Sequence, residues 1–142
     1  MGRPLRHHSA NTTFFVTSRC LQAMFLLRPD PEVNAIIGCV VARATERYES
    51  DIDLHAFCAM SNHVHFLVST RHSGRALSEF VGYIECNIAK LLNRHWGRSG
   101  KFWHRRFSAE RVLDEIIVLG LGRSGHSIPI VVGGIRAGGE SA

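Results

Sequence analysis

An alternating stretch near the middle of the chain places the strongest constraint on the fold. Residues 63–70 read His-Val-His-Phe-Leu-Val-Ser-Thr, so that polar and apolar side chains largely alternate. Neighbouring side chains of a β-strand leave opposite faces of the sheet. Val64, Phe66 and Val68 are therefore expected to enter a core, while His63 and His65 share the opposite face. The stretch predicts a sheet with one buried face and one face that carries histidines.

These two histidines are candidate metal ligands. Side chains two positions apart on a strand have Cα atoms roughly 6.5–7 Å apart, so that two imidazoles can lean onto one ion. Histidine is also the commonest metal-binding side chain. A bare His-x-His pair occurs by chance in strands that bind nothing, however, and the spacing of His63 and His65 alone leaves both interpretations open.

The remaining sequence predicts strands and helices in alternation. Four segments have the β-branched, aromatic or alternating pattern of strands: residues 12–18, 51–60, 63–70 and 108–113. Two segments carry apolar residues at three- and four-residue steps, as amphipathic helices do: residues 32–47 and 75–93. Asp30 and Pro31 are suited to cap and begin the first helix. The order predicts an α+β, ferredoxin-like fold with a central antiparallel sheet and helices packed on it.

Composition points to one globular domain with an anionic partner. The 142 residues suffice for a single core. The net charge of +5 and the isoelectric point near 9.5 favour a polyanion such as nucleic acid, although a globular protein that is merely basic is the alternative. The sequence contains no signal peptide, no apolar run approaching the roughly 20 residues of a membrane span, and no Cys-x-x-Cys pair. We expect a cytoplasmic protein with buried, reduced thiols and no membrane partner.

A basic segment with interleaved aromatic residues is a candidate DNA-binding element. Residues 101–107 read Lys-Phe-Trp-His-Arg-Arg-Phe. Aromatic rings can stack on unpaired bases while arginines pair with phosphates. The DNA-binding candidates are Lys101, Trp103, Arg105 and Arg106. The alternative is a solvated loop that Phe102 and Phe107 anchor to the core, and in that case Trp103 is structural.

The C-terminal part of the sequence changes character. Residues 120–142 hold seven of the thirteen glycines, and the helix expected to begin at Asp114 has no apolar stripe to continue it. We expect this tail to be poorly ordered. Residues 120–125 match the dinucleotide-binding pattern Gly-x-Gly-x-x-Gly, but Pro129 follows too soon for the helix that the pattern requires.

The stretch Met60-Ser61-Asn62-His63-Val64-His65 resembles the hallmark strand of the single-tyrosine HUH transposases, a group that includes the REP-associated tyrosine transposases. In that family Met-Pro-Asn commonly precedes His-hydrophobe-His, and this chain differs by Ser61 in place of proline. The resemblance continues through the helix that ends near Asn93 and through the basic, aromatic segment after it. It covers residues 5–119, which are expected to form the HUH domain, with residues 120–142 as a separate tail.

The resemblance implies metal-assisted chemistry on single-stranded or hairpin DNA. His63 and His65 would hold a divalent cation, Mg²⁺ or Mn²⁺, together with a polar residue from a C-terminal helix. A tyrosine on that helix would attack the phosphate and form a phosphotyrosine intermediate, from which the strand is rejoined. A phenol with a pKa of about 10 is a poor nucleophile at pH 7, and a cation that stabilises the developing charge makes the attack feasible. Family members are usually dimers, so the resemblance also implies a homodimer.

The expected nucleophile is missing from this sequence. Relatives carry the tyrosine in a stretch resembling Tyr-Ile-x-x-Asn-Pro-Val, but residues 120–142 contain no tyrosine. Glycine enrichment of this kind is what a shifted reading frame in GC-rich DNA produces, and we hypothesise a frameshift near Leu119. Tyr83 lies in a segment that matches a structural helix of the family and is only a weak candidate for the catalytic residue.

These observations predict a transposase-family DNA-binding protein whose covalent step is defective. One alternative is a non-catalytic DNA-binding or regulatory remnant. Another is a metal-dependent phosphodiesterase that uses water as the nucleophile and needs only the histidine pair and a cation.

Overall fold

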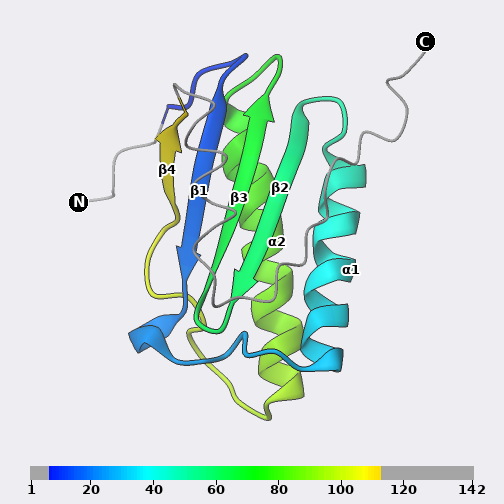
Figure 1. Cartoon of the computed structure of the whole chain (residues 1–142), viewed down its shortest axis with the longest axis vertical. Coiled ribbons are helices and arrows are strands. Elements are labelled where there is room, and N and C mark those ends of the chain that lie inside the picture. The colour runs from blue at the N-terminus through cyan, green and yellow to red at the C-terminus, as the bar shows by residue number, and fades with distance from the viewer. Residues whose placement is uncertain (1–6, 113–142) are drawn as a thin grey trace.

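The chain folds into a four-stranded antiparallel sheet with two helices (Figure 1). The computed structural model describes residues 7–112. The strands and helices follow one another in the order β1 (Thr13–Arg19), α1 (Pro31–Arg47), β2 (Ile52–Met60), β3 (His63–Thr70), α2 (Arg75–His95) and β4 (Ser108–Arg111). The strand order in the sheet is β2-β3-β1-β4. This arrangement confirms the predicted α+β, ferredoxin-like fold.

The first helix begins where the sequence predicts. Asp30 caps it, because its side-chain oxygen accepts hydrogen bonds from the backbone N–H groups of Glu32 (2.8 Å) and Val33 (3.4 Å). Pro31 occupies the first helical position, where the missing N–H costs nothing. The five buried residues of the helix recur at three- and four-residue steps, and they are Val33, Ile37, Val40, Val41 and Ala44.

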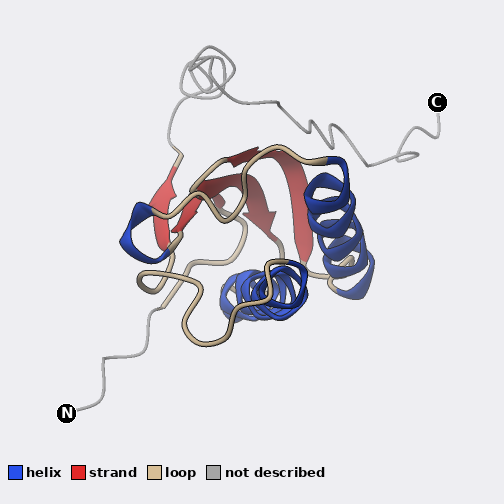
Figure 2. Cartoon of the chain, turned by 90° about the horizontal axis from the view of Figure 1, so that it is seen from below, coloured by secondary structure: helices blue, strands red, loops and turns tan. Residues whose placement is uncertain are grey.

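Both helices lie on the same face of the sheet (Figure 2). α2 lies against this face, and α1 packs beside α2 on the side of β2. The inner side chains of α2 are fully buried, among them Phe80 and Ile84, and the Phe80 ring meets the Phe66 ring of β3 edge to face at 6.4 Å. Every second residue of the central strands joins this core, including Val16, Val64, Phe66 and Val68. Neither of the two described helices covers the opposite face, which we call the open face.

The strand register brings distant parts of the chain together on the open face. β1 pairs with β3 so that Thr17 lies opposite His65 and Arg19 opposite His63. β2 pairs with the other edge of β3, which places Cys58 opposite His65 and Met60 opposite His63. Side chains of directly opposed residues share one face of a sheet. The histidines therefore sit in two cross-strand rows of the open face, and the row of His63 lies at the end of the sheet.

The structure differs from the sequence prediction at several points. A 3₁₀ turn, η1 (Leu21–Ala23), follows β1 and was not predicted. The thiols of Cys39 and Cys86 are exposed, so the expectation of four buried cysteines was wrong, although Cys20 is buried and burial raises the pKa of its thiol to about 12. The helix predicted from Asp114 and the glycine-rich tail from Gly120 lie outside the described residues, so the division at residue 119 stays a prediction.

Between residues 7 and 112, neither helix combines the length and the apolar character that crossing a bilayer requires.

Candidate metal and DNA site

His63 and His65 lie side by side on the open face of β3. Their ring centroids are 4.6 Å apart and the rings are nearly perpendicular, at 82°. Both residues are half-buried. The Phe15 ring on β1 stacks on the His65 ring at 4.9 Å, which restricts the rotation of that imidazole. The structure thus brings the two predicted metal ligands into the proximity that a shared ion requires.

Each imidazole has a hydrogen-bond partner at its Nδ1 atom. The His63 Nδ1 lies 2.6 Å from the Asn62 Oδ1, which as a carbonyl oxygen can only accept, so His63 donates and its Nε2 keeps a lone pair. The His65 Nδ1 lies 2.9 Å from the Thr17 hydroxyl. Metal-binding histidines are commonly oriented in this way by a hydrogen bond at the second ring nitrogen. The arrangement leaves the two Nε2 atoms as the candidate coordinating atoms.

The electrostatic environment keeps both imidazoles neutral. Burial, followed by the charge of Arg19, lowers the pKa of His63. Burial also lowers the pKa of His65 to about 4, with smaller contributions from His63 and Arg19. The neutral imidazole is the form that binds a metal. Both rings are therefore in the coordinating state at pH 7 without loss of a proton.

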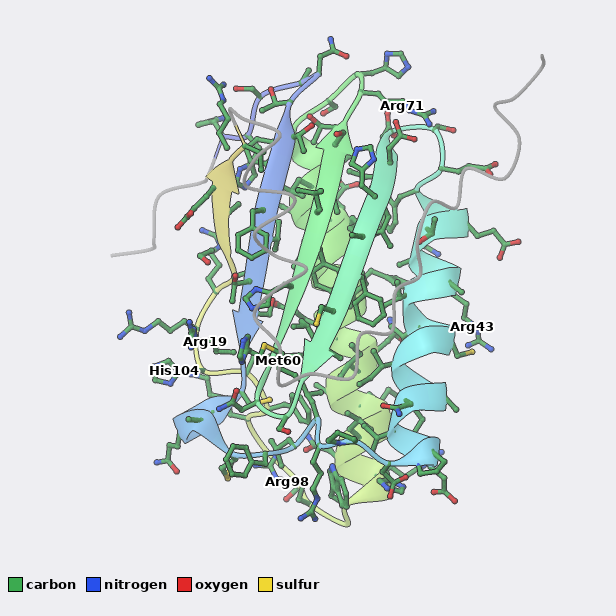
Figure 3. The ribbon with its side chains drawn as sticks, viewed as in Figure 1. Arg19, Arg43, Met60, Arg71, Arg98 and His104 are labelled. Atoms are coloured by element: carbon green, nitrogen blue, oxygen red, sulfur yellow. The ribbon has the colours of Figure 1, made fainter. Side chains whose placement is uncertain are left out.

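The basic segment runs beside the end of β1. Phe102 and Phe107 are buried and anchor it to the core. Backbone bonds hold it to β1, since the His104 N–H donates to the Arg19 carbonyl at 2.8 Å. Lys101, Arg105 and Arg106 are exposed. Figure 3 shows Arg19, Met60 and His104 at this same end of the sheet, with Arg98 further down.

Trp103 makes contacts that hold the basic segment to the end of β1 and to α2. It forms an isolated bridge with Cys20, and its indole Nε1–H donates to the Glu85 carbonyl of α2 at 2.8 Å. It is half-buried against the core. Of the four predicted DNA-contacting residues, the structure thus exposes the three cations and gives the indole a structural role.

The structure does not bring Tyr83 to the histidines. Tyr83 lies on α2, which packs against the covered face of the sheet, opposite the face that carries His63 and His65. Its ring contacts the Tyr48 ring edge to face at 6.1 Å, and the Arg47 guanidinium lies 5.4 Å from its centroid. Its position is that of a packing residue.

No third metal ligand accompanies the histidine pair within residues 7–112. That part of the chain contains no group of three or more histidine, cysteine, aspartate or glutamate side chains placed to hold an ion. His55, on β2, instead shares a 2.6 Å hydrogen bond with the Ser69 hydroxyl, as a satisfied strand histidine does. Further ligands for an ion at His63 and His65 would have to be water, a substrate oxygen, another kind of oxygen donor or groups beyond the described residues.

Three residues of the site were not predicted from the sequence, namely Thr17, Arg19 and Asn62. The strand predicted at residues 12–18 contains Thr17 but stops one residue before Arg19, and β1 includes both residues on one face. Only the register between β1 and β3 shows that this face is the one that carries the histidines. Asn62 lies in the two-residue turn between β2 and β3, and only the three-dimensional structure shows that its side chain bonds to His63.

Fold and site together define a ferredoxin-like α+β protein with a paired-histidine strand on an open sheet face. The family model described as "Transposase IS200 like" matches residues 31–117, more than half of the chain. The protein therefore belongs to the family of IS200-like transposases.

Solved structures share the fold. The REP-associated tyrosine transposase bound to a REP hairpin is 15% identical and has a TM-score of 0.61, over 85% of this chain and 68% of that chain. A crystal structure of a candidate transposase from Deinococcus radiodurans R1 is 16% identical and has a TM-score of 0.55, over 86% of this chain and 92% of that chain. No curated protein matches the sequence.

Proposed function

We propose that this protein binds single-stranded or hairpin DNA together with a divalent cation on the open face of its sheet. The observation that carries the proposal is the pair of neutral imidazoles, His63 and His65, each oriented through Nδ1 and placed beside the charge of Arg19. Membership of the IS200-like transposases supports action on DNA. A relative of the same fold is bound to a REP hairpin, which supports DNA of that form as the partner.

The residues present fit a bound cation. His63 and His65 would hold it through their Nε2 atoms, and the ion expected from the family resemblance is Mg²⁺ or Mn²⁺. When bound, the cation would polarise a phosphate and stabilise the negative charge that develops on it. Asn62 and Thr17 hold the rings in the orientation that this requires.

The cations around the pair supply DNA affinity. Arg19 lies opposite His63 in the β1–β3 ladder and is exposed, so it can pair with the phosphate nearest the histidines. Lys101, Arg105 and Arg106 extend the positive charge along the adjacent segment. Contacts of this kind neutralise phosphates without reading the base sequence.

The residues of the proposed site do not include the tyrosine nucleophile that the family resemblance implies. The sequence contains two tyrosines, Tyr48 and Tyr83, and both pack at the helices on the covered side. The family match ends at residue 117, shortly before the glycine-rich stretch begins at Gly120. We propose that the protein binds DNA without forming a phosphotyrosine intermediate. Reading the gene past codon 119 in its other two frames tests the frameshift, which predicts a Tyr…Asn-Pro-Val stretch there.

One incubation tests the proposal and separates its alternatives. The purified protein is mixed with a single-stranded hairpin oligonucleotide and Mn²⁺, and cleavage and covalent adducts are resolved on denaturing gels. Binding that needs His63 and His65, with no adduct, is the expected result. An adduct that disappears in Tyr83→Phe contradicts the missing nucleophile. Cleavage without an adduct indicates water as the attacking group, as in the phosphodiesterase alternative.

The basic segment is tested by salt dependence. Arg105→Ala is expected to weaken hairpin binding uniformly across sequences and to reduce the slope of log affinity against log salt by about 1. The matched control is Arg43→Ala, which removes an exposed arginine from α1, away from the open face (Figure 3). Equal effects of the two substitutions would show that net charge, and not this segment, attracts the DNA.

A further inference from the structure

Phe25 projects into solvent from the loop that follows β1. It is the one large hydrophobic side chain among residues 7–112 that is mostly exposed, at 64%. Single exposed hydrophobic residues are common on protein surfaces and carry little meaning alone. The backbone that presents Phe25 gives the exposure its significance.

That backbone is the loop of residues 20–28, which is held from three directions. The turn between β2 and β3, the basic segment and the end of α2 all contribute to the contacts. Four hydrogen bonds of 2.8–2.9 Å form these contacts. In the turn, the Asn62 carbonyl accepts from the Cys20 N–H and the Ser61 carbonyl from the Leu27 N–H. The Phe102 carbonyl of the basic segment accepts from the Leu21 N–H, and the Trp96 Nε1–H at the end of α2 donates to the Leu26 carbonyl. Phe25 is therefore exposed on a backbone that is fixed in place.

The loop also keeps a strained conformation. Gln22 has φ 52° and ψ 30°, and Ala23 has φ 56°, both in the left-handed region that residues with a side chain seldom adopt. Strain of this type persists where surrounding contacts enforce it, and it concentrates at functional sites. One of those contacts is the Asn62 amide, whose Nδ2 donates to the Ala23 carbonyl at 3.4 Å. The same side chain orients His63 through its Oδ1.

The surroundings of Phe25 are basic. Arg19 precedes the loop, and Arg28 ends it with its guanidinium 4.4 Å from the centroid of the Trp96 ring. The neighbouring residues 98–106 include four lysine or arginine residues and no carboxylate. A fixed, exposed aromatic ring among cations matches the way single-stranded nucleic acid is bound, with bases stacked on rings and phosphates paired with charges.

We propose that Phe25 is a stacking platform for one unpaired base of single-stranded DNA, on a loop that Asn62 ties to the histidine strand. The base would belong to a nucleotide near the phosphate that lies at Arg19 and His63. This inference rests on the proposed function and specifies which part of the DNA the loop contacts.

The experiment compares Phe25→Ala and Phe25→Trp in binding to a labelled single-stranded oligothymidylate and to a blunt duplex of equal length, followed by fluorescence anisotropy. Phe25→Ala is expected to weaken oligothymidylate binding about 5- to 100-fold, because base–ring stacking is lost. Phe25→Trp is expected to restore it, and its added indole emission to be quenched by the oligonucleotide. Duplex binding is expected to stay unchanged in both variants. Because the side chain is largely exposed, neither substitution is expected to disturb the packing of the core.

Each other outcome counts against the inference in a distinguishable way. If Phe25→Ala binds oligothymidylate as the unsubstituted protein does, the stacking role is overturned while the proposed function stands. An equal loss on single strand and duplex overturns it as well, because stacking on an unpaired base cannot explain that loss. If the unsubstituted protein binds neither oligothymidylate nor a hairpin, the inference and the proposed function both fall.

Discussion

The two faces of the sheet share one backbone ladder and differ in what covers them. On the covered face, Val16, Val64 and Phe66 are completely buried under the helices. On the open face, the alternate residues Thr17, His63 and His65 are half-buried and hydrogen-bonded to one another or to Asn62. Stability thus comes mainly from one face, which leaves the other free to carry polar groups that add little to it. The predictions below test that division.

The largest effect is expected from a matched pair of substitutions on adjacent strands. Phe66→Ala removes a fully buried ring that stacks on Phe57, and it should lower the free energy of unfolding by about 3–5 kcal/mol. Phe15→Ala makes the same chemical change on the open face, where the ring is half-buried against His65, and it should cost less than half as much. Urea unfolding followed by circular dichroism measures both. Equal losses would show that the open face also belongs to the core.

A second test concerns Thr17, which supports His65 without facing the core. Thr17→Val keeps the shape of the side chain and removes the hydroxyl at the His65 Nδ1. Removing such a supporting hydrogen bond typically costs 10- to 100-fold in metal affinity, so we expect a loss of about that size for Mn²⁺ in calorimetric titration, with little change in stability.

The control for Thr17 lies on the same strand and the same face. Thr13 bonds to the Ser69 hydroxyl at 2.6 Å, further along the sheet from the histidines. Thr13→Val should leave Mn²⁺ affinity unchanged. If Thr17→Val behaves as Thr13→Val does, the hydroxyl does not support a metal ligand.

The third test is pH dependence, because each face carries a group with a shifted pKa. Glu85 on α2 accepts a 2.6 Å hydrogen bond from the Ser18 hydroxyl, and burial raises the pKa of its carboxyl above the usual 4.5. Its contribution to stability is present below pH 4.5 and is lost as the pH rises through the raised value. Glu85→Gln should remove this loss. Urea midpoints of the two proteins between pH 4 and pH 7 would reveal it, and parallel curves would contradict it.

His65 on the open face should act in the opposite direction. Because its pKa is lowered from 6.5 to about 4, its contribution to stability is present above pH 6.5 and is lost as the pH falls toward 4. His65→Ala should therefore flatten the acid side of the same stability curve. An unchanged acid slope would mean that this imidazole titrates as it does in the unfolded chain.

Much of the fold followed from periodicity. The predicted strand at residues 63–70 has the observed bounds, and the predicted helices 32–47 and 75–93 match α1 and α2 to within two residues at each end. These segments are long or strongly patterned, and their propensity agrees with their burial. η1 was missed because residues 20–27 have no periodicity, and the contacts that hold them come from three remote segments.

The site was predictable only in part, for a related reason. His63 and His65 are two residues apart, so local geometry sufficed to place them on one face. Thr17 and Arg19 come close to the histidines because β1 pairs with β3, and Thr17 and His65 are 48 positions apart in the sequence. The register of such a distant strand pair cannot be predicted from one sequence. For Trp103 the sequence left a DNA contact and a structural role open, because composition does not reveal that its indole bonds to the Glu85 carbonyl.

The strand order has a consequence for how the chain acquires its structure. β2 and β3 are joined by two residues and can pair as soon as both exist, whereas β1 must wait for β3 before its first ladder forms. Bringing β1 to β3 closes the long loop that contains α1 and β2, which costs more entropy than closing the β2–β3 hairpin. Folding is therefore expected to begin at the β2–β3 hairpin and to finish with β1. During synthesis the first strand to leave the ribosome is thus among the last to find its partners. The histidines are in place early, and Thr17 and Arg19 complete their surroundings at the end.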